Sequence, residues 1–235
     1  MKEFVMTIKW VEVIEKNFIE LEMIFELYNR VFPIEVREPQ EIFLRSLQYA
    51  KERRPNNYHF IVGKKENQLV SFATGHYFAD VNSGFIVYIV TNPLIQSKGI
   101  GSKTLEKLED LLNKDAISAG NSSLSAIFLE TETQEMLHTE EEKEDCIKRN
   151  RFFANNDYEK YEKIVYQQPS LHDEVGDLPL NLFIKNLDIT KQSREDIKKA
   201  IRTIYKEKYS LVNGIDKRVL NNCLKKMGLE DGELL

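Results

Sequence analysis

The segment at residues 87–112 constrains the fold of this chain more than any other part of the sequence. It predicts an apolar strand, a turn at Pro93, a short loop with two glycines and then an amphipathic helix. In such a unit the loop gathers backbone N–H groups at the helix N-terminus, where the first amides lack intrahelical partners and the dipole is positive. We therefore expect this loop to bind a phosphate or diphosphate group. The residues concerned are Gln96, Ser97, Lys98, Gly99, Ile100, Gly101 and Ser102.

Two other phosphate-binding motifs do not fit this loop. A P-loop requires Gly-Lys-Ser/Thr, but Ser102 follows Gly101, and a dinucleotide-binding fingerprint requires a third glycine where Thr104 stands. For the six loop residues taken alone, an ordinary strand-to-helix turn is the alternative. The flanking strand and helix favour the phosphate-binding interpretation.

The composition is that of a soluble globular enzyme. With 235 residues, of which 42% are hydrophobic and 30% charged, the chain can bury the core of one domain, or of one domain with a tail. We find neither an apolar run of the roughly 20 residues that a membrane span needs nor a signal-peptide pattern. Only Cys146 and Cys223 are present, so we expect a cytoplasmic protein without disulfides. The net charge of −5 disfavours nucleic acid as a partner and, to a lesser degree, favours a cationic substrate.

The remaining predicted elements alternate between strands and helices. Apolar residues at helical spacing precede Pro33, which ends a first helix. Polar turns at 65–68 and 80–83 separate three strands, and this spacing predicts an antiparallel meander. We expect strands at 4–10, 58–64, 69–79, 84–91 and 124–130, and helices at 18–32, 41–50, from the glycine loop to 113–120, and from 139 to 154.

Capping signals mark the later helices. Thr139 followed by Glu142 is a capping box, so the glutamates clustered there are explained by helix capping. Two further amphipathic helices, the first starting at Ser193 and the second following Asp216 and ending at Gly228, form a C-terminal extension. We expect the extension to pack on the main domain, with a dimer or partner contact as the alternative. Its basic residues could indicate nucleic acid, but a solvated helix face explains them better because acidic residues are interspersed: Lys198, Lys199, Arg202, Lys206 and Lys208.

Two motifs resemble those of the GNAT superfamily of N-acetyltransferases. Pro93-x-x-Gln96-x-x-Gly99-x-Gly101 is similar to the Q/R-x-x-G-x-G/A signature of its acyl-CoA loop, and Phe-Phe-Ala-Asn-Asn-Asp-Tyr at 152–158 is similar to its F-Y-x-x-x-G-F motif. With the segments at 128–132, 166–171 and 179–182, they resemble a subgroup of bacterial GNAT proteins.

The resemblance implies an α/β (α+β) fold of GNAT type, with a mixed, mostly antiparallel central sheet flanked by helices. We assign residues 1–188 to the acetyltransferase domain and 189–235 to the helical C-terminal extension.

The second motif departs from the family pattern at two positions. Asp157 replaces the usual glycine, which a left-handed cap tolerates because Asp adopts that conformation more readily than most residues. Phe153 stands where many members place a tyrosine that protonates the CoA thiolate. This second departure keeps a rival function open, that of a non-catalytic or regulatory acyl-CoA-binding protein with the same fold.

The resemblance also implies acetyl-CoA as co-substrate and direct transfer of the acetyl group to an amine. In the family, acyl-CoA lies where the central strands splay apart, a place that corresponds here to Ile89, Val90 and Thr91, beside Phe153. We expect the N–H of Val90 to point at the thioester oxygen and to stabilise its developing negative charge.

The acceptor amine must lose a proton, because an ordinary primary amine with a pKa of roughly 10 is mostly protonated at pH 7. Glu130 and Glu132, which share one strand face, are candidate bases, as is His76 on the meander. A chain of water molecules is the alternative.

Three tyrosines are candidate proton donors. Tyr88 lies in the strand before the loop and could also orient the substrate, while Tyr158 or Tyr161 could replace the hydroxyl missing at Phe153. Each of them could instead be a packed aromatic residue. A thiolate can also leave without an acid, because a thiol pKa of about 8.5 makes it a tolerable leaving group.

We expect the acceptor between the first two helices and their connector, facing Glu35 and His76 and close to Arg37, Glu38 and Glu41. The four histidines are far apart and fit no ligand spacing, so no metal is expected. The sequence therefore predicts an acyl-CoA-dependent N-acetyltransferase that acts on a small-molecule or peptide amine. Neither nucleic acid nor a membrane is an expected partner, and a homodimer stays open.

Overall fold

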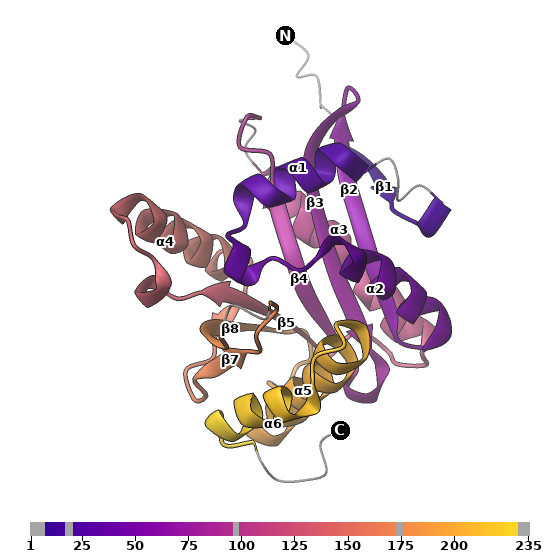
Figure 1. Cartoon of the computed structure of the whole chain (residues 1–235). Coiled ribbons are helices and arrows are strands. Elements are labelled where there is room, and N and C mark those ends of the chain that lie inside the picture. The colour runs from indigo at the N-terminus through magenta and orange to yellow at the C-terminus, as the bar shows by residue number, and fades with distance from the viewer. Residues whose placement is uncertain (1–7, 17–20, 96–98, 173–175, 230–235) are drawn as a thin grey trace.

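The computed structural model describes residues 8–16, 21–95, 99–172 and 176–229 (Figure 1). The strands are β1 (Lys9–Glu12), β2 (Asn57–Lys65), β3 (Gln68–Phe78), β4 (Ser83–Thr91), β5 (Ala126–Glu132), β6 (Glu159–Lys160), β7 (Tyr166–Gln168) and β8 (Leu178–Asn186). The helices are α1 (Glu22–Val31), α2 (Gln40–Glu52), α3 (Ile100–Ser118), α4 (Glu140–Ala154), α5 (Arg194–Thr203), the π-helix η5 (Ile204–Val212) and α6 (Lys217–Lys226). None of the helices in these ranges is long and apolar enough to cross a membrane.

The strands form one sheet in the order β1-β2-β3-β4-β5-β8-β6, and β7 pairs with β8 outside this path. Every pairing between described strands is antiparallel except that of β4 with β5. Strands β2, β3 and β4 make up the predicted meander, because short polar turns join them. The predicted fold class, a mixed and mostly antiparallel sheet flanked by helices, is confirmed.

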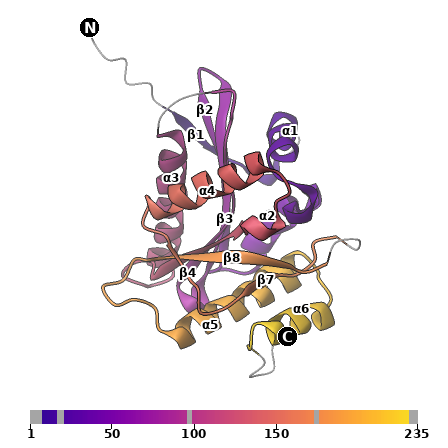
Figure 2. The ribbon, with the colours of Figure 1, turned by 90° about the vertical axis from the view of Figure 1, so that its left-hand side faces the viewer.

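Helices cover both faces of the sheet. On the front face in Figure 1, α1 and α2 lie over β2, β3 and β4, while α5, η5 and α6 lie over β5, β7 and β8. Helix α3 crosses the back of the sheet, and α4 lies beside it (Figure 2). The front face is therefore divided between an N-terminal and a C-terminal layer of helices.

Helix ends agree with the sequence where capping residues are present. Thr139 accepts a hydrogen bond from the N–H of Glu142 at 3.1 Å, and the Glu142 carboxylate accepts one from the N–H of Thr139 at 2.9 Å. Ser193 and Asp196 cap α5 in the same reciprocal way. Gly228 has a left-handed φ of +67° beyond α6, as predicted for a C-cap. The predicted beginnings of the first strand and first helix lie outside the described residues.

The C-terminal helices share a core with the sheet. Buried residues of α5, η5 and α6 form one cluster with Phe85, Phe128 and Tyr166 of the strands. One expectation is wrong, however, because Lys208 is only 1% exposed rather than on a solvated face. The helix changes from α to π at Ile204, and i→i+5 bonding alters which side chains face inward.

Candidate functional site

Strands β4 and β5 separate part-way along their length. They pair in parallel from Ser83 with Ala126 to Ile86 with Leu129, and no pairing continues beyond this point. On its other edge, β4 carries a bulge, because Thr74 pairs with Tyr88 while Gly75 pairs with Ile86. The predicted splay of the central strands is thus present.

A pocket of about 320 Å³ opens beside the separated part of β4. This loop pocket is lined by Ile89, Val90, Thr91, Ile95, Gly99, Ile100, Gly101, Ser102, Arg149, Phe152 and Phe153. All predicted cofactor-binding residues that the structure describes are on its wall. Gln96, Ser97 and Lys98 lie outside the described residues.

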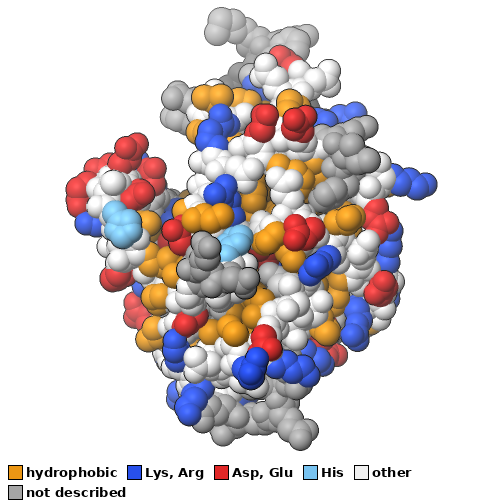
Figure 3. Space-filling model, viewed as in Figure 1, with side chains coloured by type: hydrophobic (Ala, Val, Ile, Leu, Met, Phe, Trp, Pro, Cys, Tyr) orange, Lys and Arg blue, Asp and Glu red, His pale blue; other side chains and the backbone are white. Residues whose placement is uncertain are grey.

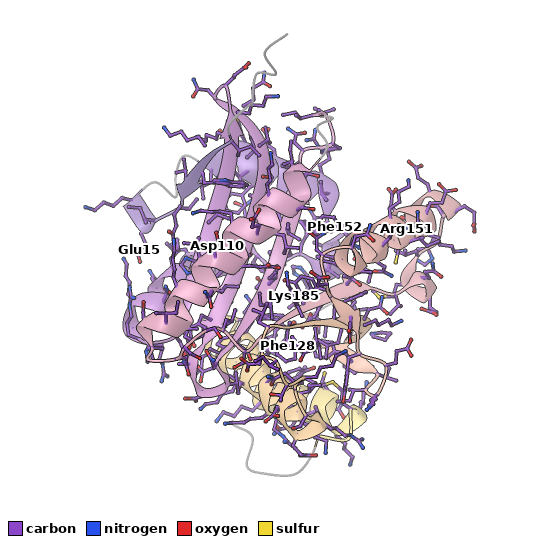
Figure 4. The ribbon with its side chains drawn as sticks, turned by 180° about the vertical axis from the view of Figure 1, so that it is seen from behind. Glu15, Asp110, Phe128, Arg151, Phe152 and Lys185 are labelled. Carbon is purple, nitrogen blue, oxygen red and sulfur yellow. The ribbon has the colours of Figure 1, made fainter. Side chains whose placement is uncertain are left out.

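The start of α3 suits a diphosphate group. Gly99, with a φ of +88°, precedes the helix, whose first turn contains no acidic residue to compete for its free N–H groups. A Cβ at Gly101 would lie 3.0 Å from the ring of Phe152, closer than an ordinary van der Waals contact, so a side chain here would press on this wall of the pocket. Figure 4 shows Phe152 of α4 beside the first turns of α3.

Contrary to our prediction, the N–H of Val90 does not face the gap between β4 and β5. Asn92 donates its N–H to the carbonyl of Val70 at 2.8 Å, and the same register pairs Val90 with Phe72. Since bonding alternates along an antiparallel ladder, the N–H of Val90 also points at β3. The amides of Ile89 and Thr91 point away from β3, towards the gap between β4 and β5.

A second pocket, of about 60 Å³, lies on the other side of the splay, between the two layers of helices on the front face. This carboxylate pocket is lined by Phe32, Val36, Glu38, Phe85, Ile86, Val87, Tyr88, Glu130, Thr131, Glu132, Gln168, Leu171, Leu180 and Tyr209. On the face in Figure 3, apolar side chains gather between α1 and the C-terminal helices, with charged side chains around them. Three glutamates, Glu38, Glu130 and Glu132, therefore line a pocket whose other residues are largely apolar.

Glu130 is held by two tyrosines. The hydroxyl of Tyr166 donates to Oε1, and the hydroxyl of Tyr209 lies 2.9 Å from Oε1 and 2.8 Å from Oε2. Burial raises the pKa of Glu130 to about 7, although the two hydroxyls act to lower it. Near neutral pH this carboxyl can both accept and release a proton.

The other two carboxylates have cationic partners. Glu132 Oε2 lies 2.8 Å from Nη2 of Arg149, and Glu38 Oε1 lies 2.7 Å from Nζ of Lys208. Glu38 and Lys208 are 6% and 1% exposed, so theirs is a buried ion pair. Among the described residues, Glu130 is the one carboxylate of this pocket without an ion pair.

Tyr88 anchors the connector between α1 and α2. Its hydroxyl donates to the carbonyl of Val36 at 2.9 Å and accepts the N–H of Glu38 at 3.0 Å. The hydroxyl proton is therefore already engaged. In this arrangement Tyr88 positions the wall of the carboxylate pocket.

Residues 21–144, more than half of the chain, match the model of the acetyltransferase (GNAT) family. The chain belongs to the GNAT acetyltransferase family. No curated protein matches the sequence.

GNAT structures share the fold at low sequence identity. A GNAT-family protein from Bacteroides thetaiotaomicron superposes with a TM-score of 0.62 at 19% identity, covering 88% of this chain and 99% of that one. A GNAT acetyltransferase from Staphylococcus aureus Mu50 gives 0.51 at 16% identity, covering 77% and 100%. The ribosomal-protein-S18-alanine N-acetyltransferase of Escherichia coli gives 0.51 at 12% identity, covering 80% and 98%.

Three residues that we predicted for the GNAT site are absent from the walls of both pockets. His76 is 0% exposed, and burial lowers its pKa well below the usual range, which makes it an unsuitable base. Tyr158 donates its hydroxyl to Glu109 of α3 at 2.8 Å, and its ring packs edge-on against that of Phe153. Glu35 lies in the connector, but Glu38 supplies the carboxylate that reaches the pocket.

Sequence reasoning missed the residues that arrive from the C-terminal part of this GNAT chain. Tyr166 was part of a recognised segment, but nothing in its surroundings indicated a bond to Glu130. Lys208 and Tyr209 lie 170 and 79 positions from their partners Glu38 and Glu130. No group of three or more His, Cys, Asp or Glu side chains in the described ranges is arranged to bind a metal.

Proposed function

We propose that this protein transfers an acetyl group from acetyl-CoA directly to a primary amine, with Glu130 as the general base. The observation that carries the proposal is the position of Glu130 in the carboxylate pocket, beyond the paired part of β4 and β5 and without a cationic partner. Enzymes of the GNAT family depend on acyl-CoA, and this family membership supports the choice of co-substrate.

The loop pocket has the features needed to hold CoA. The first amides of α3 would bind the diphosphate, while Ile89 and Thr91 offer backbone groups to the pantetheine arm. Bound acetyl-CoA would supply an activated acetyl thioester. A backbone N–H of Ile89 or Thr91 facing the gap would stabilise negative charge on the thioester oxygen.

Glu130 suits proton transfer better than an ordinary glutamate does. Transfer from an ammonium of pKa near 10 to a carboxylate of pKa near 7 is unfavourable by about 4 kcal/mol, against about 8 kcal/mol for a carboxylate of pKa 4.3. Glu132 is a poorer candidate because Arg149 neutralises its carboxylate. The environment of Glu130 therefore halves the equilibrium free-energy cost of taking the proton from the ammonium.

The leaving thiolate does not need a dedicated acid in this proposal. Phe153 has no hydroxyl, and the hydroxyls of Tyr88 and Tyr158 are bonded elsewhere. A thiol pKa of about 8.5 allows the thiolate to leave near neutral pH and to take a proton from water afterwards.

Glu130→Gln tests the role of the base. We expect E130Q to bind acetyl-CoA with the affinity of the unmodified protein, measured by calorimetry, and to lose roughly 10²- to 10⁴-fold in kcat. The assay is thiol release on a panel of primary amines that includes polyamines, aminoglycosides and amino acids. Glu135→Gln is the matched control, because Glu135 is exposed beyond the end of β5.

The possible outcomes separate the parts of the proposal. Equal activity of E130Q and E135Q would exclude Glu130 as the base. Absence of binding heat with millimolar acetyl-CoA or CoA would exclude the co-substrate. Binding of CoA without turnover of any amine would favour the rival, a non-catalytic acyl-CoA-binding protein, for which Phe153 is the one indication.

A further inference from the structure

The π-helix η5 lies outside the part of the chain that matches the GNAT family model, yet it reaches the proposed site. Three consecutive residues of this helix, Glu207, Lys208 and Tyr209, are at most 5% exposed. Tyr209 lines the carboxylate pocket, and Lys208 pairs with Glu38 of the same pocket. The C-terminal extension thus contributes polar groups to the pocket as well as apolar ones to the core.

We propose that Tyr209 is a positioning residue, whose hydroxyl holds the carboxylate of Glu130 in the orientation that accepts a proton from the acceptor amine. This inference rests on the proposed function. It assigns to the extension a part in the reaction that the family match does not cover.

Two tyrosines bind the carboxylate of Glu130. Tyr166 donates from β7 and Tyr209 from η5, so the carboxylate is held from two elements that are distant in the sequence. The ring of Tyr205 contacts both tyrosine rings, with its centroid 6.4 Å from that of Tyr166 and 5.4 Å from that of Tyr209. The packed rings fix both hydroxyls, and Glu130 itself lines the carboxylate pocket, where an ionised carboxylate can accept further hydrogen bonds.

The charges around Glu130 favour an ammonium as its ligand. Glu38 of the connector and Glu132 of β5 also line the pocket, but each has its own cation, Lys208 and Arg149 respectively. Neither cation is on the pocket wall. An acceptor that enters as an alkylammonium therefore meets one carboxylate without an ion pair, surrounded by neutral hydroxyls and apolar side chains.

The hydroxyl of Tyr209 also controls when Glu130 is ionised. Burial and the charge of Glu38 raise the pKa of Glu130, while Tyr166, Tyr209 and Lys208 lower it. A hydrogen bond to a charged group contributes enough to move a pKa by about one unit. Loss of the Tyr209 hydroxyl should therefore raise the pKa of Glu130 further and reduce its ionised fraction at pH 7.

Tyr209→Phe tests this inference without relying on activity. Glutamate labelled with ¹³C at the side-chain carboxyl, with E130Q to identify the signal, gives the pKa of Glu130 directly by NMR. We expect Y209F to raise this pKa by about one unit or more. Tyr205→Phe is the matched control, because Tyr205 is on the same helix and donates to the carbonyl of Gln167 instead.

Kinetics provide the second readout. We expect the acid limb of kcat/KM in Y209F to move to higher pH, with a loss of about fivefold or more at pH 7 that diminishes towards pH 9, and with unchanged affinity for acetyl-CoA. A purely structural role would lower activity equally at every pH. The NMR titration could shift in Y209F while the unmodified protein turns over no amine. That result would refute the proposed function but would still show that Tyr209 binds the carboxylate of Glu130.

An unshifted Glu130 signal in Y209F overturns the inference. If Y209F does not fold, 3-fluorotyrosine at position 209 replaces it, since its more acidic hydroxyl is a stronger donor. This replacement must lower the pKa of Glu130, and an unchanged pKa overturns the inference equally.

Discussion

The buried ion pair between Glu38 and Lys208 joins the connector after α1 to the π-helix, and Lys208→Met tests how much it contributes to stability. Nζ of Lys208 lies 2.7 Å from Oε1 of Glu38, and Nδ2 of Asn213 donates to the same oxygen at 2.6 Å. Methionine preserves the length and apolar character of the lysine stem. The variant therefore removes the charge and leaves the Glu38 carboxylate buried with one neutral donor.

Two free-energy costs determine how much stability K208M is expected to lose. Breaking a buried ion pair by removing one partner costs about 3–5 kcal/mol, because a charge is left without compensation in the interior. The carboxylate can escape this cost by taking up a proton. Relative to a glutamate in the unfolded chain, protonation costs about 3.7 kcal/mol at pH 7 and about 1 kcal/mol at pH 5. We therefore expect K208M to lose roughly 3–4 kcal/mol at pH 7 and about 1 kcal/mol at pH 5.

Urea unfolding at the two pH values measures these differences. Glu38→Gln in the K208M background removes the stranded charge and should recover most of the loss at pH 7. Lys217→Met is the control, because Lys217 of α6 is exposed and has no ion pair among the described residues, and it should change stability by less than about 0.5 kcal/mol. A loss by K208M below about 1 kcal/mol at pH 7, or one that is equal at both pH values, would refute this reasoning.

Two further predictions concern other parts of the molecule. Burial acts to lower the pKa of His59, but bonds to Asp115 at 2.7 Å and Glu12 at 2.6 Å outweigh it and raise the pKa to about 9. The resulting stability, about 3 kcal/mol, is present below pH 6.5 and is lost as pH rises through 9. Urea titrations should show this loss in the unmodified protein but not in H59Q. Gly101→Val should weaken acetyl-CoA binding in calorimetry at least about tenfold, because its Cβ would press on Phe152; an unchanged Kd would place CoA elsewhere.

Local patterns in the sequence were sufficient for the helices and for most strands, but β7 and β8 were not among the predicted strands. Strand alternation, polar turns and the Thr139 capping box each depend on neighbours within a few residues, so they can be recognised without tertiary information. Strand periodicity likewise predicted that Glu130 and Glu132 share a face, and both line the carboxylate pocket. It did not indicate which of the two would be neutralised.

The register between β3 and β4 decided which backbone amides face the gap between β4 and β5, which the motif resemblance did not. The resemblance assigned residues 89–91 to the cofactor as a group. The bond from Asn92 to Val70 then determines which amides face the splay, and it directs the N–H of Val90 to β3. A shift of one residue in that register would have reversed the assignment.

The sequence by itself determined a strand–loop–helix unit, an antiparallel meander and helices with defined caps, because these follow from short-range periodicity and capping. The mixed sheet was predicted from the resemblance to GNAT motifs, and phosphate binding at the start of α3 stays a prediction. Only the tertiary structure decided the chemistry of the carboxylate pocket. It paired Glu132 with Arg149, paired Glu38 with Lys208, and left Glu130 with two tyrosine hydroxyls. Whether a carboxylate is neutralised, buried or basic depends on groups that approach through space, and those groups come from distant parts of the chain.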